Sequence, residues 1–473
     1  MGESLIYILE LMYFIIIVGT VIVVLLENRN PVKTISWIMV LIFLPIIGLV
    51  LYLFFGKDTR KVRLISRKAM KRILGLSKHG NNIEERRRWP DRYISLISLM
   101  SKLSPHAFLY GGNSLTIQSD GTSFFLSLLL DIGQAKDHIH LEFYIIEDDP
   151  LGRLIRDVLI DKAREGVKVR VLYDGVGSWS IKKNFFKSVQ CDKIETQSYL
   201  PVKFPLLTKR VNYRNHRKIV VIDGNIGYVG GMNLAYRYLR GNICGEWRDT
   251  QLRIVGEGVY GLQTVFIADW YFANGTILTE KNLHPPISNK DGAMVQIVTT
   301  QPIGEWKEMM QGYMKLFTLC KEYLYVQTPY YIPTEGIRDA LCGAALSGVD
   351  VRLMIPFKSD SRLVHQVSLS YLEEIMDAGV KVYRYKGGFL HSKLLVADDS
   401  FMTVGSTNMD FRSFENNFEI NAFVYDTEAA TEAKQLFLED IKKSSLMIPR
   451  KWKRRSAWKR INESVLRLLS PLL

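Results

Sequence analysis

The chain carries the same short motif twice, inside a scaffold that is also repeated. A His-x-Lys-x4-Asp pattern occurs at residues 216–223 and again at 391–398. Around it, β-branched and aromatic segments flanking a helical stretch occur at 138–146 and 165–173, and recur at 322–330 and 347–354. The offset is 182 residues from Gly166 to Gly348 and 175 residues from His216 to His391. A duplicated strand–helix–strand unit of this kind predicts an α/β fold with two similar lobes.

Each copy of the motif has the same companions downstream. The copies themselves consist of His216, Lys218 and Asp223, and of His391, Lys393 and Asp398. A Gly-Gly or Gly-Ser pair precedes an asparagine 17 residues after each histidine, at Asn233 and Asn408, and an acid follows later, at Asp249 and Glu419. A single motif is a weak pattern, because a lone histidine on a strand is more often a packing residue. Two complete copies favour a catalytic role over a packing role.

The residue types suit a phosphodiester. Side chains two apart on a strand point the same way, so the His-x-Lys spacing predicts an imidazole and an ammonium on one strand face. The glycines allow the backbone to approach an anion closely, and the asparagine amide adds a neutral donor. Two lysines and two asparagines can therefore surround one phosphate, and we predict that both copies form one active site.

The predicted chemistry is covalent. One imidazole would attack phosphorus to give a phosphohistidine, and the other would protonate the leaving alkoxide and later deprotonate the incoming alcohol or water. Asp249 and Glu419 are the best-placed acids to orient the two imidazoles. Asp223 and Asp398 are expected to brace the site. Lysine and asparagine supply the charge stabilisation, so no metal or other cofactor is expected.

A second histidine pattern precedes the motif. His138 and His140 have a spacing that can ligate a metal ion, but no third ligand is evident, so a solvated or pocket-lining strand face is favoured. Glu142 shares that face, and we consider it a possible part of a pocket for the acceptor alcohol.

The N-terminal segment predicts a membrane anchor. Residues 5–26 form an apolar run that would be ~33 Å long as a helix, and residues 35–55 form a second uncharged run in which Pro45 and Gly48 are tolerable. No signal-cleavage pattern follows. We predict a transmembrane hairpin, with a shallow re-entrant hairpin as the alternative. Basic residues begin at Lys57, which places the lobes on the cytoplasmic side, although Arg29 and Lys33 in the link weaken the asymmetry.

The location of charge and cysteine narrows the class further. The net charge is +14, but residues 57–88 and 442–460 together carry +18, so the rest of the chain carries −4. A nucleic-acid groove should be basic through the body of the protein, so an anionic membrane surface is the expected partner and nucleic acid is not. The four cysteines lie far apart without a CxxC pair, which argues against disulfides and zinc and suits a reducing compartment.

The C-terminal residues are both basic and amphipathic. Residues 450–460 combine Lys and Arg with two tryptophans, and apolar residues follow at helical spacing. These apolar residues are Ile461, Val465, Leu468, Leu469 and Leu472. The segment is either a helix lying on the membrane or a terminal helix docked on the protein.

These patterns predict five parts. They are a transmembrane hairpin (1–56), a basic juxtamembrane linker (57–104), a first lobe (105–285), a second lobe (286–448) and a basic amphipathic tail (449–473).

On its paired motifs, the sequence resembles the phospholipase D superfamily and, within it, the bacterial cardiolipin synthases. The narrower resemblance rests on residues 30–37 and 43–48 of the apolar hairpin, 212–218, 408–413 and 417–419. It implies two pseudo-twofold-related α/β/α lobes around one site, in a multi-pass protein of the cell membrane. It also implies transfer of a phosphatidyl group from one phosphatidylglycerol to another with release of glycerol, His216 as nucleophile and His391 as general acid and base. A membrane-bound phospholipase D that hydrolyses lipid and a membrane-tethered nuclease are the alternatives.

Overall fold

The computed structural model describes residues 2–26, 31–52, 65–76, 90–181, 185–186, 194–201, 213–287, 291–304, 306–468 and 470. The chain divides into two compact units. One comprises Met1–Arg63 with two short pieces, Lys203–Val211 and Ile303–Glu305. The other holds Leu64–Val202, Asn212–Pro302 and Trp306–Leu473, and therefore both predicted lobes.

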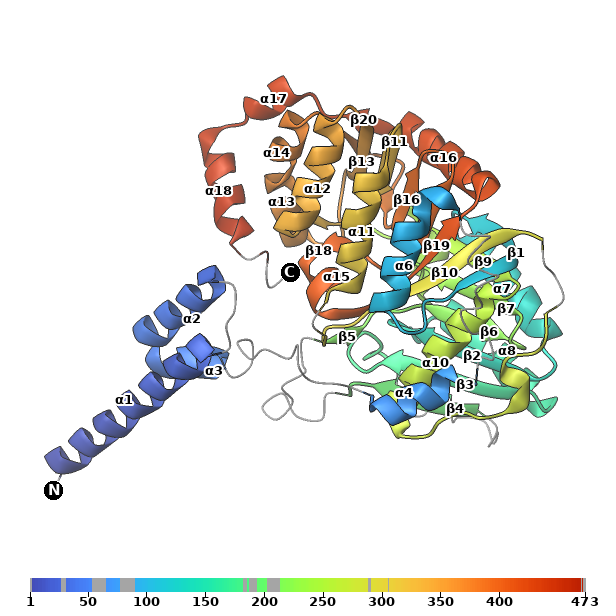
Figure 1. Ribbon diagram of the computed structural model, residues 1–473, viewed down its shortest axis with the longest axis horizontal. Helices are drawn as coiled ribbons and strands as arrows, with labels where there is room; N and C mark the ends of the chain where they lie inside the picture. Colours follow the sequence, from blue (N-terminus) through green and yellow to red (C-terminus); the bar gives the residue numbers. More distant parts are fainter. Residues whose placement is uncertain are drawn as a thin grey trace. The chain divides into compact units, whose positions relative to one another are not determined.

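The N-terminal unit is helical (Figure 1). It contains α1 (Gly2–Leu26), α2 (Pro31–Phe43) and α3 (Pro45–Leu51). The expectation that Pro45 lies inside one continuous second helix is wrong, because α2 ends at Phe43 and Leu44 leaves the helical region with φ −128° and ψ 68°. The proline ring disfavours helical backbone in the residue before it. No helix among the residues that the structure describes is both long and apolar enough to cross a membrane. The link residues 27–30 and the basic residues 57–64 and 77–88 lie outside the described residues.

The larger unit is built on one mixed sheet of 16 strands, of which fifteen follow one another in order and β5 (Arg214–Asn215) pairs off this path with β19 (Asn417–Tyr425). Its first half runs from one edge as β4 (Ile194–Tyr199), β3 (Lys168–Asp174), β2 (His138–Phe143), β6 (Ile219–Ile222), β7 (Ile226–Gly230), β9 (Gln251–Val255) and β1 (Leu109–Gln118). Its second half continues as β10 (Ala293–Thr300), β19 (Asn417–Tyr425), β17 (Phe401–Gly405), β16 (Leu394–Ala397), β11 (Tyr323–Gln327), β13 (Asp350–Pro356), β14 (Lys381–Tyr385) and β20 (Ser444–Leu446).

The strand order shows the duplication directly. The two halves mirror each other about an antiparallel seam, where β1 pairs with β10, with Leu109 opposite Gln296. The predicted α/β class and repeat are therefore present, and the two halves share a single sheet through this seam.

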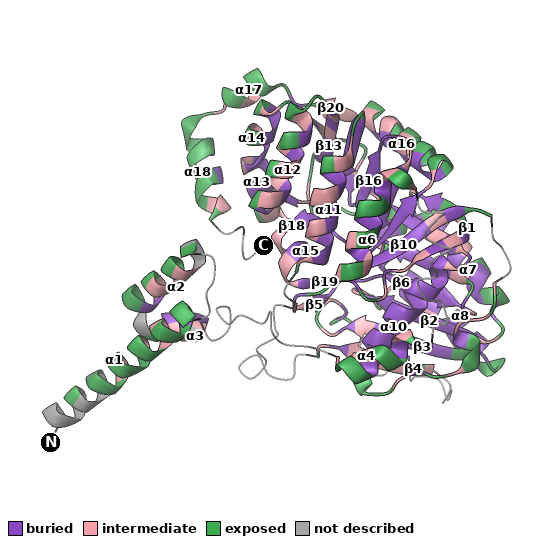
Figure 2. Ribbon diagram, in the orientation of Figure 1, coloured by how far each residue is buried: buried purple, intermediate pink, exposed green. Residues whose placement is uncertain are grey.

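Helices cover both faces of the sheet, as α11 (Glu308–Leu319) and α16 (Thr427–Lys442) do for the second half (Figures 1 and 2). Strand β11 shows the consequence. Leu324 and Val326 belong to one apolar cluster, whereas Tyr323 and Tyr325 belong to another on the opposite face. Because both faces are covered, the central strands carry continuous apolar runs, which is why the residues between each motif lysine and aspartate are all buried.

Candidate active site

A pair of two-residue ladders positions the motif histidines. Strand β5 (Arg214–Asn215) runs parallel to the start of β19, with Asn215 opposite Phe418. The next residue, His216, donates its backbone N–H to the carbonyl oxygen of Phe418 at 2.9 Å. The first-half histidine is thus held against a second-half strand.

The second copy is held in the same way. Strand β15 (Phe389–Leu390) runs parallel to β8 (Trp247–Arg248), with Leu390 opposite Arg248. His391 follows and donates its backbone N–H to the carbonyl oxygen of Arg248 at 2.8 Å. Each ladder therefore joins one half of the chain to the other.

This exchange pairs each imidazole with an acid from the opposite half. His216 Nδ1 lies 2.9 Å from Glu419 Oε2, and His391 Nδ1 lies 2.6 Å from Asp249 Oδ2. Both carboxylates are fully buried. The sequence identified these two acids without assigning either to a particular histidine, and the crossed arrangement follows only from the ladders.

The surroundings lower the pKa of both imidazoles. Burial lowers the pKa of His216 to about 4, although the charge of Glu419 opposes the shift. Burial and then the charge of Lys393 lower the pKa of His391, with Asp249 opposing. A carboxylate at Nδ1 holds the proton on that nitrogen, so Nε2 is the nitrogen that presents a lone pair for reaction.

The lysines lie behind the histidines. The prediction that His216 and Lys218 lie on a strand is wrong, because they lie in a link just before β6. The second copy lies in a similar link just before β16. Lys218 Nζ donates to the carbonyl oxygen of His216 at 2.5 Å, and Lys393 Nζ donates to that of His391. Burial lowers the pKa of Lys218 to about 7 and that of Lys393 to about 8.

The motif aspartates lie at the far end of the strands. Asp223 and Asp398 follow β6 and β16 with left-handed backbone, φ 51° and 50°. The Asp398 carboxylate accepts the backbone N–H groups of residues 321, 322 and 323 at 2.7 to 2.9 Å, and Arg92 also donates to it. Asp223 accepts from residues 136, 137 and 138. Both carboxylates anchor a neighbouring strand, and neither binds a motif histidine.

We expect Asp398→Ala to lower the free energy of unfolding by about 3 kcal/mol, because it leaves three buried or half-buried N–H groups without their acceptor. Thermal or urea denaturation of the purified protein in detergent measures this. Asp339→Ala is the control, since that side chain is 66% exposed and forms an ion pair with the partly exposed Arg338, so a change below ~0.5 kcal/mol is expected. Equal effects of the two substitutions would contradict the anchoring role.

A cavity of about 260 Å³ opens where the two halves meet. Its walls include both histidines, both predicted asparagines, three arginines and two acids. These residues are His216, His391, Asn233, Asn408, Arg214, Arg237, Arg412, Asp360 and Asp410. Asn233 is held in place, as its Oδ1 accepts from the N–H of Ile145 and its Nδ2 donates to Tyr238 Oη, both at 3.1 Å.

The sequence reasoning missed the arginines. Arg237 and Arg412 each follow the motif asparagine of their half by four residues, so an Asn-x3-Arg pattern is repeated along with the rest. That repeat is the signal that would have found them. A cavity lined by guanidinium groups, with two lysines behind it, is complementary to phosphate.

Three residues are not where the sequence placed them. Glu142 does not line the cavity; it is fully buried and its Oε1 accepts from Asn215 Nδ2 at 2.7 Å. His138 and His140 are neither solvated nor pocket-lining, because helices cover their strand face and both are fully buried. His138 Nδ1 lies 2.7 Å from Asp137 Oδ2, and the His140 ring stacks on Phe266 at 4.4 Å. Within the described part of the chain, no three His, Cys, Asp or Glu side chains gather as a metal site.

Comparisons with known proteins place this site in a family. Residues 128–250 and 313–441 match the family model described as cardiolipin synthase, PLD-like domain, and residues 14–57 match that of the phospholipase D-nuclease N-terminal segment. A crystal structure of phosphatidylserine synthase from Haemophilus influenzae aligns with a TM-score of 0.60 and 14% identity, over 80% of this chain and all of that one, and shows the shared fold.

The chain belongs to the phospholipase D superfamily, whose domain it contains twice. Two relatives are similar over nearly their whole length. The cardiolipin synthase of Halalkalibacterium halodurans is 40% identical over 96% of this chain and 91% of its own, and that of Listeria innocua is 39% identical over 99% of both. Within the superfamily, the chain is a member of the bacterial cardiolipin synthase family.

Proposed function

We propose that this protein transfers a phosphatidyl group from one phosphatidylglycerol to a second, producing cardiolipin and free glycerol. The observation that carries the proposal is the pair of buried imidazoles, each fixed by an acid of the opposite half, at one cationic cavity. The relatives named cardiolipin synthase, about 40% identical over nearly the full chain, support the choice of lipid.

The proposed reaction has two steps. In the first, Nε2 of His216 attacks the donor phosphorus, the bond from phosphorus to the glycerol oxygen breaks, and protonated His391 gives that oxygen its proton. In the second, His391 accepts the proton of a glycerol hydroxyl on the second lipid, whose oxygen attacks phosphorus and displaces His216. Asp249 stabilises the imidazolium of His391 before the first step and again after the second.

Cations around the phosphate would stabilise the negative charge of the transition state. Lys218 and Lys393 lie behind the imidazoles, and Arg237 and Arg412 line the opening. Positive groups fixed before the substrate arrives need no reorganisation during reaction, which makes their stabilisation effective.

Arg237→Ala and Arg412→Ala should each raise KM for phosphatidylglycerol by about 10- to 100-fold, because each removes a charge-assisted contact worth roughly 1.5 to 3 kcal/mol. Initial rates against the mole fraction of phosphatidylglycerol in mixed micelles measure this. Arg153→Ala is the control, since its guanidinium is 57% exposed and pairs with Asp148, which does not line the cavity. An unchanged KM in both cavity variants would remove these arginines from the site.

The glycerol hydroxyl groups of the acceptor lipid would contact the two acids that line the cavity. Asp360 lines the cavity and accepts from Tyr330 Oη at 2.8 Å, and Asp410 lies beside Asn408. Burial raises the pKa of Asp410 to about 6. Carboxylates accept hydrogen bonds from a polyol, so these two residues take the place proposed from sequence for Glu142.

The rate should depend on pH at both ends. Below about pH 4 the His216 imidazole gains a proton and loses its nucleophilic lone pair, and between about pH 7 and 8 Lys218 and Lys393 lose the charge that stabilises phosphate. We therefore expect kcat/KM to fall on either side of a plateau. Assays at constant ionic strength test this. The pKa of Lys218 is the lower of the two, so Lys218→Arg should move the start of the alkaline fall to higher pH because arginine keeps its charge. A flat alkaline profile would refute the lysine assignment.

Product analysis tests the proposed function most directly. Purified protein in phosphatidylglycerol bilayers should yield cardiolipin and glycerol in equal amounts. Phosphatidic acid as the sole lipid product would identify a hydrolase instead, since water then resolves the same intermediate.

We further propose that the N-terminal unit anchors the protein as a multi-pass segment, with the catalytic unit on the cytoplasmic side. Exposed apolar side chains along α1 and α3 support this, among them Leu11, Phe14, Leu26 and Ile46 at 60 to 78% exposure. Basic residues follow α3 in the sequence from Lys57 onward, as the positive-inside rule requires. In a cysteine-free background, Asn28→Cys should react with an impermeant maleimide in intact cells. Reaction only after permeabilisation would indicate a re-entrant hairpin.

A further inference from the structure

The C-terminal helix docks on the second half by the side that carries Leu466, which packs on the apolar cluster, together with several ion pairs. It follows α17 (Pro449–Lys453) and spans Ala457–Arg467 as α18. Helix α18 packs on α13 (Arg362–Ser370), and α17 packs on α14 (Leu372–Asp377). Arg467 Nη1 lies 2.6 Å from Glu374 Oε1, and Arg455 Nη2 lies 2.9 Å from Glu463 Oε2 and 3.4 Å from Glu373 Oε2. Glu463 is buried in this contact.

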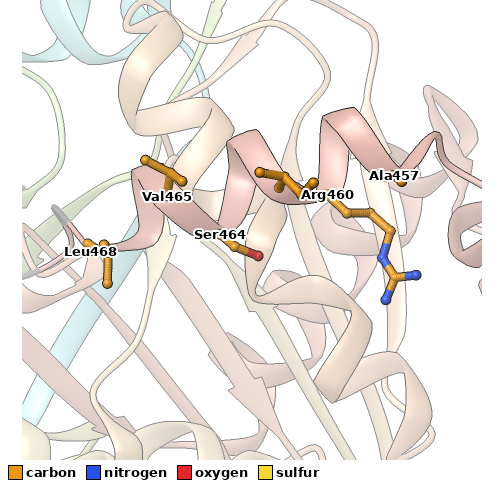
Figure 3. A pocket seen from close by; sticks show the side chains of 6 residues that line it. Ala457, Arg460, Ser464, Val465 and Leu468 are labelled. Atoms are coloured by element: carbon orange, nitrogen blue, oxygen red, sulfur yellow. The ribbon is translucent and has the colours of Figure 1, made fainter.

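The apolar side of α18 faces outward. Trp458, Ile461, Val465 and Leu468 are 78%, 54%, 56% and 78% exposed. Their spacing of three and four residues places them on one stripe of the helix. A shallow groove runs along the stripe, lined by Ala457, Arg460, Ile461, Ser464, Val465 and Leu468 (Figure 3). A helix on the surface of a soluble domain has the opposite orientation, with its apolar stripe toward the core.

Charge around the stripe identifies what covers it. Residues 442–460 hold nine Lys or Arg and no acid. Arg450, Lys451, Arg454 and Lys459 are exposed and form no ion pair with any described residue. A basic segment beside an apolar stripe with an indole has the composition of a helix that lies in the headgroup region of an anionic bilayer. A second copy of the chain is disfavoured, since a twofold contact would bring the two basic segments together.

The docked helix is also linked to the cavity. Helix α13, on which α18 packs, carries Val364, and that side chain lines the cavity. Helix α18 therefore packs on an element that contributes a side chain to the cavity wall. Of the two alternatives from sequence, docking and membrane contact, the structure accommodates both, on opposite sides of one helix. Leu469 and Leu472 of the predicted stripe lie outside the described residues.

We infer that α17 and α18 form a docking face for an anionic lipid surface, which holds the catalytic unit against the bilayer independently of the N-terminal anchor. The inference rests on the proposed function only in taking the substrate to be a membrane lipid. It predicts that full activity on bilayers needs this face, whereas activity on lipid dispersed in detergent does not.

The full chain in nanodiscs tests binding without using activity. Hydrogen–deuterium exchange of residues 456–468 should slow at least about fivefold in discs containing phosphatidylglycerol, relative to discs of phosphatidylcholine alone. Exchange that is equal in the two disc types overturns the inference. Slowing that follows protein concentration instead of anionic lipid also overturns it, and identifies a second copy as the occupant.

A variant that places acids on the apolar stripe tests whether this face is needed for activity on bilayers. Trp458→Glu/Ile461→Glu/Val465→Glu should lose the exchange protection and lower the initial rate on phosphatidylglycerol vesicles about 5- to 20-fold, with a rate in mixed micelles within about twofold of wild type. Leu126→Glu/Leu130→Glu is the control, since these two leucines are 59% exposed and lie on α7 (Gly121–Gln134), outside the proposed face. Loss of rate in micelles as well, or equal loss in the control, overturns the inference. Absence of cardiolipin from the wild type with intact protection would instead refute the proposed function.

Discussion

Replacing His216 by alanine should lower the rate of phosphatidyl transfer by at least about 10⁴-fold, since removing a catalytic nucleophile leaves only binding and charge stabilisation. His216 reaches the cavity on a backbone held by Phe418, so the substitution removes the imidazole without removing its support. The expected loss is in kcat, because the cations that bind phosphate remain.

Trapping identifies the covalent intermediate. Wild-type protein mixed with phosphate-labelled phosphatidylglycerol and denatured in alkali should carry label on His216 and not on His391. His365→Ala is the matched control, as that histidine lies outside the cavity lining and its loss should change the rate less than about threefold. Label on neither motif histidine, while wild type turns over, would refute the covalent route. Label on His391 alone would exchange the two roles.

Glu419→Gln should lower the rate by about 10³- to 10⁴-fold, comparable to removing the charge of the acid that orients a catalytic histidine. Glu419 accepts from His216 Nδ1 and also from Ser413 Oγ at 2.8 Å and Asn417 Nδ2 at 3.1 Å. The amide keeps the shape but loses the charge that selects the tautomer. Because Glu419 raises the pKa of His216, the variant lowers that pKa further, so protonation of the nucleophile cannot explain the loss.

The crossed pairing makes this test specific. Glu419→Gln, in the second half, should suppress label on His216, the first-half histidine. Asp249→Asn, in the first half, should slow proton transfer through His391. Enzyme-bound label measured at millisecond times tests the first of these expectations. Undiminished formation of labelled His216 in Glu419→Gln would contradict the pairing seen in the structure.

Much of the site followed from sequence, because duplication preserves spacing. The histidines, lysines and asparagines of both copies lie at or directly behind one cavity, as their repeated frame predicted. The pairing of each histidine with an acid did not follow, because it depends on two ladders between segments 142 and 203 residues apart. Nothing local in the chain encodes such a contact.

The predictions from sequence were wrong where helices from elsewhere in the chain bury residues whose local pattern indicates exposure. His138 and Glu142 alternate with apolar residues, which indicated an accessible strand face, but helices bury both faces of this sheet and their polar atoms bind internal partners. Pro45 breaks a helix that hydropathy alone treats as continuous. The missed Arg237 and Arg412 were visible as a repeat, and only the geometry of the cavity shows what they face.

The exchanged ladders bear on how such a protein evolves. A chain containing only one half would hold a histidine without its acid, so it would need an identical neighbour to complete each pair. Once two copies are fused, a substitution in one half is no longer imposed on the other, and the two pairs can diverge. The acid is an aspartate beside His391 and a glutamate beside His216. Fusion would thus free two once-equivalent histidines to take the different roles proposed for them.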